Sequence, residues 1–346
     1  MDNVLNRHNG GVGILGLGSY VPSRIMTNAE VEASTGLPPG TIEHKTGIRQ
    51  RRVVGDDEVA SEMAATASAE ALAQAGITAE QLDLILGCTF SADYVMPALA
   101  CKIHQLLGAK KAGAFDLMAN CTAFQVGLSV ASDRLKADRT LDHALVVGAA
   151  IVSRYLDWTD PSSAIYFGDG VGAAVLGRVP DGYGFLAHEV FTHSQAYEAV
   201  RLRGGSSARL NSARPNGVAA YLEMNGLDVW KFAAQYQPVA MRRALEKAGK
   251  TLAETDFFIF HQANFHLIDY IMRKLRIPSD RTLINVGELG NTAEASMAIA
   301  LTEAVRQKRL KHGDLVVISG VGAGFTFGAS VMRWYDSGTA GADAAR

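Results

Sequence analysis

The sequence lacks a long apolar run and lacks any large excess of charge of one sign. No uninterrupted apolar stretch approaches the ~18 residues of a membrane span, and the first ten residues show no charged-then-apolar leader pattern. With 33 Lys and Arg against 35 Asp and Glu, the net charge is −2, which provides no field for general nucleic-acid binding. These absences predict a cytoplasmic protein that binds neither a membrane nor a nucleic acid.

Cysteine is scarce, and its spacing excludes two common uses. Cys88, Cys101 and Cys121 are an odd number and show no C-x-x-C spacing. That pattern argues against a disulfide framework and against a zinc site. We therefore expect no metal, and any chemistry of cysteine has to come from a single thiol.

Short apolar runs alternate with helical patterns along the first half. Residues 84–88, 144–147 and 173–176 are predicted as strands, and residues 59–75 and 97–107 as helices. This alternation predicts an α/β protein with a mostly parallel sheet covered on both faces. Residues 183–225 break the pattern, and we expect an irregular insertion or lid there.

The second half of the sequence repeats the first. Leu145-Val-Val recurs 170 positions later as Leu315-Val-Val, and Cys121-Thr corresponds at the same spacing to Asn291-Thr. The strand before Cys88 matches the strand before His261. The repeat predicts two similar halves, residues 1–180 and 181–346, that bring Cys121, His261 and Asn291 towards one centre.

Cys121 stands where a buried strand is predicted to end and a helix to begin. Phe124, Leu128, Ala131 and Leu135 follow it at helical spacing. At a helix start, the dipole and unpaired backbone N–H groups favour the thiolate and lower the pKa of a thiol. Cys121 is therefore a candidate nucleophile, although a small buried apolar residue is the commoner role of a free cysteine.

His261 and Asn291 each have an ordinary interpretation when taken singly. His261 ends an apolar strand, where ligands sit in open α/β sheets, but it could be a hydrogen-bonded core histidine. Asn291 could be a helix N-cap. Together with Cys121 they form a set used in cysteine proteases, where Asn orients a basic His, and in decarboxylative condensing enzymes, where both donate hydrogen bonds to a thioester carbonyl. The duplicated α/β architecture favours the second chemistry.

Six motifs carry a resemblance to a known family. They are Thr46-Gly-Ile-Arg49, Asn120-Cys-Thr-Ala-Phe124, Phe167-Gly-Asp-Gly-Val-Gly-Ala-Ala-Val175, Phe260-His-Gln-Ala-Asn264, Gly290-Asn-Thr-Ala-Glu-Ala-Ser296 and Gly322-Ala-Gly-Phe-Thr-Phe-Gly328. Over residues 13–334 the chain resembles β-ketoacyl-acyl-carrier-protein synthase III, a family of thiolase-fold condensing enzymes. The resemblance implies a five-layered αβαβα sandwich of two repeated halves, a homodimer and no cofactor.

The resemblance also implies a reaction. Cys121 would take an acyl group from acyl-coenzyme A or an acyl-carrier-protein thioester, and a malonyl-carrier-protein thioester would then lose CO₂ and condense with it. The backbone N–H groups of Cys121 and Ala323 would hold the developing oxyanion, and His261 and Asn291 would stabilise the enolate. The alternative is an acyltransferase on the same fold that passes the Cys121-bound acyl group to a hydroxyl or an amine.

Substrate-binding positions follow from the same resemblance. Lys45 stands where fatty-acid-initiating members carry an arginine that clasps coenzyme A, so a carrier-bound primer is also expected. Met96 aligns with a residue that closes the acyl pocket across the dimer interface, and a flexible methionine there predicts a primer longer than acetyl. The full set of expected substrate-binding residues is Met96, Arg154, Lys45, Asn264 and Phe124.

Two further positions complete the prediction. Lys231, Arg273 and Lys274 align with basic residues that dock the carrier protein, although they also fit a solvated helix face. Glu294 stands where the family usually has a small residue. It is either a buried carboxylate with a function near the site or an exposed first-turn glutamate favoured by the helix dipole. These departures favour a specialised-metabolite condensing enzyme over fatty-acid initiation.

Overall fold

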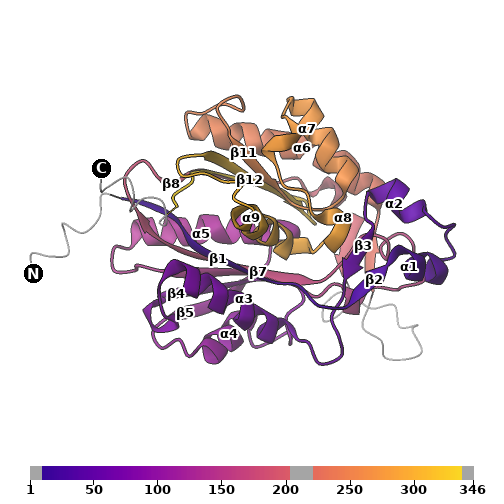
Figure 1. The fold of residues 1–346 in the computed structure, drawn as a ribbon, viewed down its shortest axis with the longest axis horizontal. Coiled ribbons are helices and arrows are strands. Elements are labelled where there is room, and N and C mark those ends of the chain that lie inside the picture. Colours follow the sequence, from indigo (N-terminus) through magenta and orange to yellow (C-terminus); the bar gives the residue numbers. More distant parts are fainter. Residues whose placement is uncertain (1–9, 203–220, 337–346) are drawn as a thin grey trace, which may run out of the picture.

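The computed structural model describes residues 10–202 and 221–336 of the chain, and these residues form five alternating layers of helices and sheets. Figure 1 shows the layers from α6 and α7 at the top, through the sheet of β11 and β12, the central α5 and α9, and the sheet of β1 and β7, to α3 and α4 at the bottom. The described residues contain no helix long and apolar enough to cross a bilayer.

The first large sheet has the strand order β1-β7-β6-β4-β5. Strands β4, β5 and β6 run parallel to one another, whereas β7 is antiparallel to both of its neighbours. The bounds are β1 Gly11–Tyr20, β4 Leu84–Cys88, β5 Gly113–Leu117, β6 Ala144–Ala150 and β7 Gly170–Val179.

The second large sheet has the order β11-β12-β13-β8, and two short pairs of strands lie outside both sheets. Its bounds are β8 Gly184–Thr192, β11 Phe257–Phe260, β12 Leu315–Gly322 and β13 Thr326–Arg333. The short pairs are β2 Ile25–Thr27 with β3 Gln50–Arg52, and β9 Val200–Leu202 with β10 Leu222–Met224.

The expectation of a mostly parallel sheet is wrong. Among the described strands, three of the seven pairings in the two large sheets are parallel and four are antiparallel. The cause is visible at β12 and β13, which are joined by residues 323–325 alone. A link of that length can only make a hairpin, because a parallel return needs a crossover of about a dozen residues.

Three layers of helices cover and separate the sheets. The outer face of the first sheet packs against α3 and α4, the two inner faces pack against α5 and α9, and the outer face of the second sheet packs against α6 and α7. Their bounds are α3 Ala60–Ala75, α4 Leu99–Leu107, α5 Ala123–Ala137, α6 Gly226–Lys247, α7 Phe265–Leu275 and α9 Ser296–Arg306. The predicted αβαβα sandwich is thus confirmed.

Glycines in β1 set how closely the outer helix approaches the sheet. A Cβ atom at Gly18 would lie 2.0 Å from the carbonyl oxygen of Ala67 in α3, a separation that only glycine avoids. The alanine-rich face of α3, including Ala64 and Ala71, is fully buried against this strand layer. Small residues on both sides therefore bring helix and strand backbones into contact.

The repeat seen in the sequence is matched by equivalent contacts in the two sheets. The Asp83 N–H before β4 donates to His143 O (2.9 Å), and the Asp256 N–H before β11 donates to Leu315 O (2.9 Å). Each aspartate carboxylate also accepts a hydrogen bond from the start of the neighbouring strand. The Asp83 carboxylate accepts from Asp142 N just before β6 (2.7 Å), and the Asp256 carboxylate accepts from Leu315 N at the start of β12 (2.8 Å). Strands β4 and β6 are therefore the counterparts of β11 and β12, while the division of the chain at residue 180 stays a prediction.

The expectation of an irregular segment at residues 183–225 is wrong for the first part of that range. Gly184–Thr192 forms strand β8, which pairs with β13 along its length. Its buried Glu189 hides the strand in the sequence pattern, because a charged residue is not expected at a buried strand position. The Glu189 carboxylate is paired with Lys247 at 2.5 Å. After β8 come the 3-10 segment η4 Ser194–Ala199 and strand β9. Residues 203–220 lie outside the described residues.

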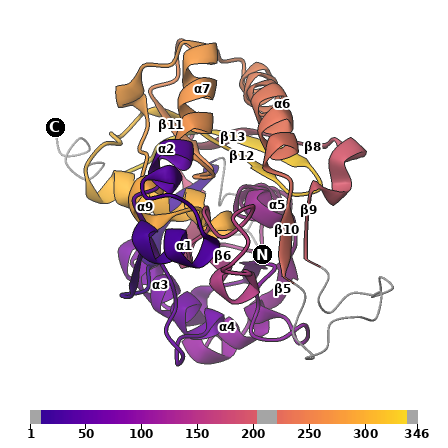
Figure 2. The same ribbon diagram turned by 90° about the vertical axis from the view of Figure 1, so that its right-hand side faces the viewer.

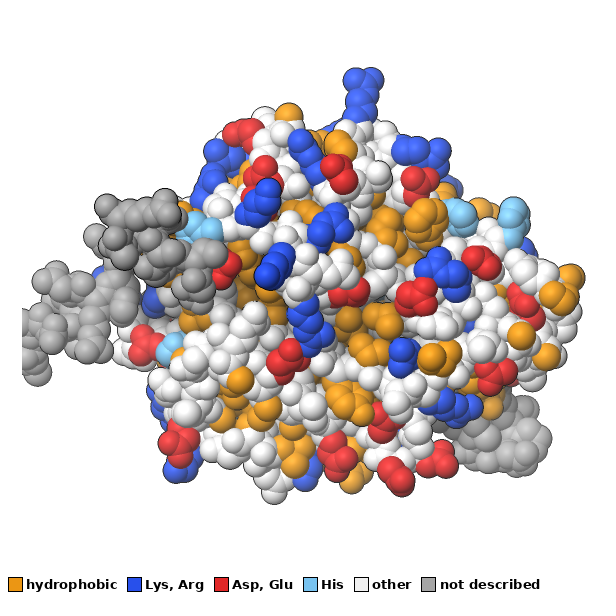
Figure 3. Space-filling model, viewed as in Figure 1, with side chains coloured by type: hydrophobic (Ala, Val, Ile, Leu, Met, Phe, Trp, Pro, Cys, Tyr) orange, Lys and Arg blue, Asp and Glu red, His pale blue; other side chains and the backbone are white. Residues whose placement is uncertain are grey.

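The smaller helices stand at one end of the layers. Figure 2 brings α1, α2 and the β9–β10 pair towards the viewer. Helix α2 contacts α7, where the His266 imidazole lies 3.0 Å from His44 O. The bounds are α1 Asn28–Thr35, α2 Thr41–Thr46 and α8 Val286–Leu289. On the face shown in Figure 3, basic and acidic side chains are interspersed, in keeping with the small net charge.

Candidate active site

Cys121 lies in a single 3-10 turn, η2 Asn120–Thr122, between β5 and α5. Asn120 has a φ of 50°, a left-handed conformation that asparagine tolerates better than most residues. Its side-chain amide donates to Ala323 O (3.1 Å), and the Thr122 hydroxyl donates to Ala119 O (2.7 Å). The predicted strand–cysteine–helix order is confirmed, and these bonds hold the turn that presents the thiol.

The prediction of a lowered thiol pKa at Cys121 is wrong. Burial raises the pKa of Cys121, and the negative charge of Glu294 raises it further, while a hydrogen bond from its own backbone N–H acts in the opposite direction. The helix-dipole argument left out the loss of water around the sulfur, which disfavours the charged form. The resting residue is a thiol, so its proton has to leave during acyl transfer.

His261 is the first residue after β11 and is 4% exposed. Its Nδ1 lies 2.7 Å from Ser296 Oγ, and the Gln262 backbone N–H donates to the same oxygen at 3.2 Å. The Ser296 hydroxyl can donate to Nδ1 while it accepts from Gln262 N, and this arrangement puts the imidazole proton on Nε2. Burial lowers the pKa of His261 to about 4, so the ring is neutral near pH 7.

Ser296 is the residue that sequence reasoning missed. It closes the 290–296 motif and begins α9, and its side chain is fully buried. The available signal was a hydroxyl-bearing residue in a motif that also holds Asn291. Its partner lies 35 positions away in sequence, which no local pattern reveals.

Asn291 lies between α8 and a second 3-10 turn, η6 Ala293–Ala295. Its N–H donates to Tyr166 O (2.8 Å), and its carbonyl accepts from Gly168 N (3.1 Å). The side-chain oxygen accepts from Ala293 N (2.9 Å), but Thr292 holds the N-cap position of η6, so the interpretation of Asn291 as an N-cap is wrong. With the oxygen used in this way, the NH₂ group is the part that can donate to a ligand.

The three segments meet around the carboxyl end of β12. A Cβ at Gly320 would lie 3.2 Å from the Cβ of His261, and a Cβ at Gly322 would lie 2.4 Å from Ala119 O beside the cysteine turn. Turns η2 and η6 also pack against each other. Strand ends from both sheets and the starts of both central helices therefore surround one point, as the repeat predicts.

Cys121 lines a cavity of about 310 Å³. Ala323 and Gly324 lie on its wall, so the loop that follows β12 faces the same space as the thiol. Asn291 and Asn264 line a smaller neighbouring cavity of about 60 Å³. The apolar lining of the larger cavity comes from Phe90, Met118, Phe167, Val200, Leu202 and Leu222. This is a setting suited to a hydrocarbon chain attached to sulfur.

Two predicted substrate-binding residues have local structural roles. Phe124 is fully buried in the central core and lines neither of these two cavities, so its expected contact with substrate stays a prediction. The helical spacing that placed it near Cys121 turns its ring into the layer between the sheets. Asn264 caps α7 by accepting from His266 N (2.8 Å) and Leu267 N (3.3 Å), although it also borders the smaller cavity.

Three others lie on the surface. Lys45 is an exposed residue of α2. Arg154 donates to backbone carbonyl groups at Gly55, Asp56 and Glu58, the last at 2.7 Å, so its guanidinium braces that loop. Met96 is 82% exposed and does not line the cavity at Cys121.

The predicted docking residues lie on α6 and α7. All three are exposed. Arg273 pairs with Asp269 at 2.7 Å within its own helix, and Lys274 donates to Ala234 O at 2.9 Å across to α6. An intrahelical pair of this kind contributes little to stability. Their charges therefore remain accessible at the surface, and their docking role stays a prediction.

Glu294 is fully buried, so the interpretation as an exposed first-turn glutamate is wrong. It belongs to η6, three residues after Asn291. Its side chain reaches back to the first sheet, where Phe90 N donates to its Oε1 at 2.9 Å. The carboxyl group thus lies beneath the cysteine turn.

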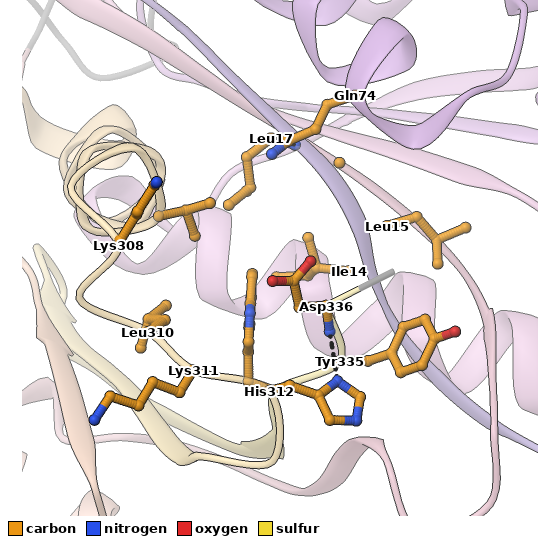
Figure 4. A pocket seen from close by; sticks show the side chains of 13 residues that line it. Ile14, Leu15, Leu17, Gln74, Lys308, Leu310, Lys311, His312, Tyr335 and Asp336 are labelled. Carbon is orange, nitrogen blue, oxygen red and sulfur yellow. Dashed lines mark hydrogen bonds between the residues drawn. The ribbon is translucent and has the colours of Figure 1, made fainter. Parts of the chain in front are cut away.

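A separate cavity of about 590 Å³ lies near the opposite end of β12 (Figure 4). Most of its residues come from β1, the segment before β12 and the segment after β13, with Gln74 from α3 and Val305 from α9, and none of the predicted catalytic residues is among them. Its His312 is held by Asp336 N (3.1 Å) and the Tyr183 hydroxyl (2.9 Å). No cysteine, serine or threonine among the described residues lines this cavity, so the predicted thiol chemistry belongs to the site at Cys121.

Comparison with known proteins identifies the family. The sequence profile described as 3-oxoacyl-[acyl-carrier-protein (ACP)] synthase III matches residues 115–194, and the profile of its C-terminal part matches residues 245–334. The β-ketoacyl-[acyl-carrier-protein] synthase III of Desulfitobacterium hafniense (strain Y51) is 38% identical over 328 residues, covering 94% of this chain and 99% of that protein. This chain belongs to the 3-oxoacyl-[acyl-carrier-protein] synthase III family. It is therefore a β-ketoacyl synthase III-like condensing enzyme, a transferase.

Other relatives agree with this family. The enzyme of the same name from Symbiobacterium thermophilum is 39% identical over 326 residues, which is 93% of this chain and 98% of that protein. The crystal structure of 3-oxoacyl-[acyl-carrier-protein] synthase III from Aquifex aeolicus VF5 matches with a TM-score of 0.86 and 34% identity, over 94% of this chain and 100% of that chain. The fold is therefore the thiolase fold of the 3-oxoacyl-[acyl-carrier-protein] synthase III family.

A solved structure of a priming enzyme is similar to the same degree. The priming β-ketosynthase from the R1128 polyketide biosynthetic pathway matches with a TM-score of 0.87 and 32% identity, over 94% of this chain and 97% of that chain. The family assignment thus holds across relatives named as 3-oxoacyl-[acyl-carrier-protein] synthase III and as a priming β-ketosynthase of a polyketide pathway.

Proposed function

We propose that this member of the 3-oxoacyl-[acyl-carrier-protein] synthase III family catalyses decarboxylative Claisen condensation through Cys121, His261 and Asn291. The observation that carries the proposal is the placement of Cys121 on the wall of an apolar cavity that also includes Ala323 and Gly324. A thiol at that position can hold an acyl chain inside the protein while its carbonyl oxygen lies near backbone N–H groups.

The first half-reaction is acyl transfer. The Cys121 sulfur attacks the carbonyl carbon of the primer thioester, the bond from that carbon to the carrier sulfur breaks, and the departing thiol leaves with the proton that Cys121 loses. The backbone N–H groups of Cys121 and Ala323 stabilise the oxyanion of the tetrahedral intermediate, and one such donor is worth roughly 3–4 kcal/mol. The hydrogen bond from the Asn120 side chain to Ala323 O joins the cysteine turn to the loop after β12, the two backbone segments that carry these donors.

The second half-reaction is condensation. The bond between the malonyl carboxylate and its α-carbon breaks, CO₂ leaves, and the electron pair forms an enolate on the carrier thioester. The Nε2–H of neutral His261 and the NH₂ of Asn291 donate to the enolate oxygen, and neither side chain has to take a proton. The enolate carbon then attacks the acyl carbonyl, and the Cys121 sulfur leaves as a thiolate that regains a proton.

We further propose that the primer is longer than acetyl and that it arrives on an acyl-carrier protein or on coenzyme A. The cavity volume of about 310 Å³ leaves room for several methylene groups beyond the thioester. An acyl-carrier protein would dock on Lys231, Arg273 and Lys274, whose positive charges suit its acidic surface. Malonyl-carrier protein would use the same surface in the second half-reaction.

We propose that the enzyme is a homodimer. Strand β5 forms the edge of the first sheet, and an edge strand with exposed apolar residues is prone to pair with a second copy. Phe115 of this strand is 46% exposed, Met118 just after the strand is 70% exposed, and Val95 in the segment before α4 is 87% exposed. In such a dimer the partner's copy of the Met96 segment could reach the acyl cavity, which would explain why Met96 lies outside the cavity of its own chain.

The experiment that tests the proposal measures the CO₂ released during condensation. Purified enzyme is incubated with radiolabelled malonyl-carrier protein and a series of acyl-coenzyme A and acyl-carrier-protein primers, and released CO₂ and the carrier-bound product are measured. Condensation predicts one CO₂ per β-ketoacyl product. Acylation of the enzyme without CO₂ release, together with transfer of the acyl group to an added alcohol or amine, would instead support the acyltransferase alternative.

A further inference from the structure

Glu294 is a buried carboxyl group that the proposed reaction does not use. Its side chain has no exposed surface, and η6, which carries it, packs against η2, β6, β7, α5 and α9. Gly148 of β6 lies directly under the turn, because a Cβ there would be 2.5 Å from Glu294 O. The carboxyl group is thus enclosed between the cysteine turn and the first sheet.

One oxygen of Glu294 holds a wall of the acyl cavity. Phe90 N donates to Oε1 at 2.9 Å, next to the buried Thr89. Ser91 continues this buried polar chain, since its N–H donates to the Thr89 hydroxyl at 2.9 Å and its hydroxyl accepts from Ile151 N at 2.9 Å. Phe90 itself lines the cavity with Cys121. Glu294 therefore fixes the backbone that aims this ring at the acyl chain.

The other oxygen of Glu294 has no partner. Oε2 is a buried atom without a hydrogen bond among the residues that the structure describes. Burying a carboxylate with a hydrogen bond to only one of its oxygens costs more free energy than burying a neutral acid in the same geometry. Burial accordingly raises the pKa of Glu294 to about 8, so the group keeps its proton near neutral pH.

The groups that face Glu294 favour the neutral form as well. Cys121 on η2 and Cys88 at the end of β4 are close enough for a charge on Glu294 to raise the pKa of each thiol. Strand β6 carries no titratable residue, and the charged residues of the other three elements lie towards their far ends in sequence: Arg178 in β7, Asp133, Arg134 and Lys136 in α5, and Glu303 and Arg306 in α9. His261, linked to η6 through Ser296, is neutral. No cation therefore stands ready to offset an ionised Glu294 within this group of elements.

We propose that Glu294 is a positioning residue of the condensing site: as a neutral acid it holds the Phe90 wall of the acyl cavity, and its ionisation opposes loss of the proton from Cys121. The proposal deepens the proposed function and rests on it for the reaction of the acyl chain. It does not make Glu294 a catalytic residue, because the carboxyl group acts on Phe90 and Cys121 and not on the substrate.

Two variants separate the hydrogen bond from the charge. Glu294→Gln keeps an acceptor oxygen for Phe90 N but cannot ionise, whereas Glu294→Ala removes both. Glu80→Gln is the matched control, since Glu80 is an exposed partner of Lys110 outside the site. Each purified variant is measured for the rate of Cys121 alkylation by iodoacetamide between pH 6 and 10, located by peptide mass spectrometry, and for kcat/KM over primers of increasing chain length.

We expect Glu294→Gln to be alkylated at Cys121 roughly tenfold faster than wild type at pH 9, because the opposing charge is gone, and to match wild type at pH 6. We expect its ratio of kcat/KM between long and short primers to follow that of wild type, while Glu294→Ala changes this ratio roughly fivefold through loss of the Phe90 anchor. Glu80→Gln should follow wild type in both readouts.

The outcomes against the proposal are specific. Identical pH profiles of Cys121 alkylation in wild type and Glu294→Gln would show that the charge of Glu294 does not affect deprotonation of Cys121. A primer preference in Glu294→Gln that shifts as far as that of Glu294→Ala would show that the wall needs a carboxylate anion. The alkylation readout uses no primer, so it decides the coupling even if the enzyme fails to condense acyl thioesters. That failure would count against the proposed function alone.

Discussion

The two turns that open the central helices have the same place in the fold and opposite chemistry. Turn η2 leads into α5 and presents the Cys121 thiol, while the corresponding stretch before α9 presents the Asn291 amide and then buries Glu294. The residue before each functional side chain has a positive φ, 50° at Asn120 and 68° at Gly290. The repeat thus fixes the backbone, and the side chains placed on it divide the work between a nucleophile and hydrogen-bond donors.

This division explains why one half alone cannot form the site. The nucleophile comes from the first half, and the neutral donors His261 and Asn291 come from the second. Ser296 connects the two donors' segments by bonding His261 Nδ1 from the start of α9.

The largest effect should come from the nucleophile. Cys121→Ala is expected to lose β-ketoacyl product formation by about 10³-fold or more, because no other group can hold the acyl chain. The matched control is Cys101→Ala, since Cys101 is an exposed thiol on α4. Product formation followed by mass spectrometry should be unchanged in the control, and equal loss in both variants would contradict the assignment.

The next largest effect should come from the opposite turn. Asn291→Ala is expected to accept the primer on Cys121 while its malonyl decarboxylation falls by roughly 10²–10³-fold, the range for loss of one donor to an oxyanion. Single-turnover acylation and CO₂ release are the two measurements. Full decarboxylation by the variant would refute the role of Asn291 at the enolate.

A smaller effect is expected at the residue that orients His261. Ser296→Ala removes the donor to Nδ1, so the ring can take the wrong tautomer, and decarboxylation should fall about tenfold. Because burial lowers the pKa of His261 to about 4, the wild-type rate should show no step from His261 ionisation between pH 6 and 8. A clear loss of rate centred near pH 6.5 would mean that His261 titrates as an ordinary histidine.

The smallest effect concerns stability. Glu294 keeps its proton up to about pH 8 in the fold, whereas in the unfolded chain it loses it near pH 4.5, the ordinary value. The folded state therefore binds the extra proton, and its stability falls as pH rises through this window. Glu294→Gln should be free of this loss and have a free energy of unfolding roughly 1–3 kcal/mol higher than wild type at pH 8, with no gain at pH 4. Urea titrations at both pH values measure the difference, and an equal difference at both would contradict it.

Much of this organisation could be predicted from the sequence because the repeat and the motifs are local patterns. They indicated the strand–cysteine–helix junction and the three segments that converge, and the family resemblance carried by the motifs implied the layers. The antiparallel strands were missed because alternation of strand and helix does not reveal a hairpin such as β12–β13, or the strand β8 with its buried Glu189.

The remaining features that the sequence does not reveal concern burial, which depends on the packing of distant segments. Phe124 follows Cys121 closely in sequence, yet its ring points into the core between the sheets. The pKa of Cys121 is raised because its surroundings exclude water and include Glu294, neither of which a helix-start pattern contains. The Ser296–His261 bond likewise joins residues 35 positions apart.

The central claim is that Cys121 carries the acyl group. The most direct measurement is peptide mapping by mass spectrometry of wild-type enzyme incubated with an acyl thioester primer in the absence of malonyl-carrier protein. The account predicts the added acyl mass on the peptide that contains Cys121, and its disappearance when malonyl-carrier protein is supplied. An acyl mass found instead on Cys101 or Cys88, or an adduct on Cys121 that persists after malonyl-carrier protein is added, would contradict it.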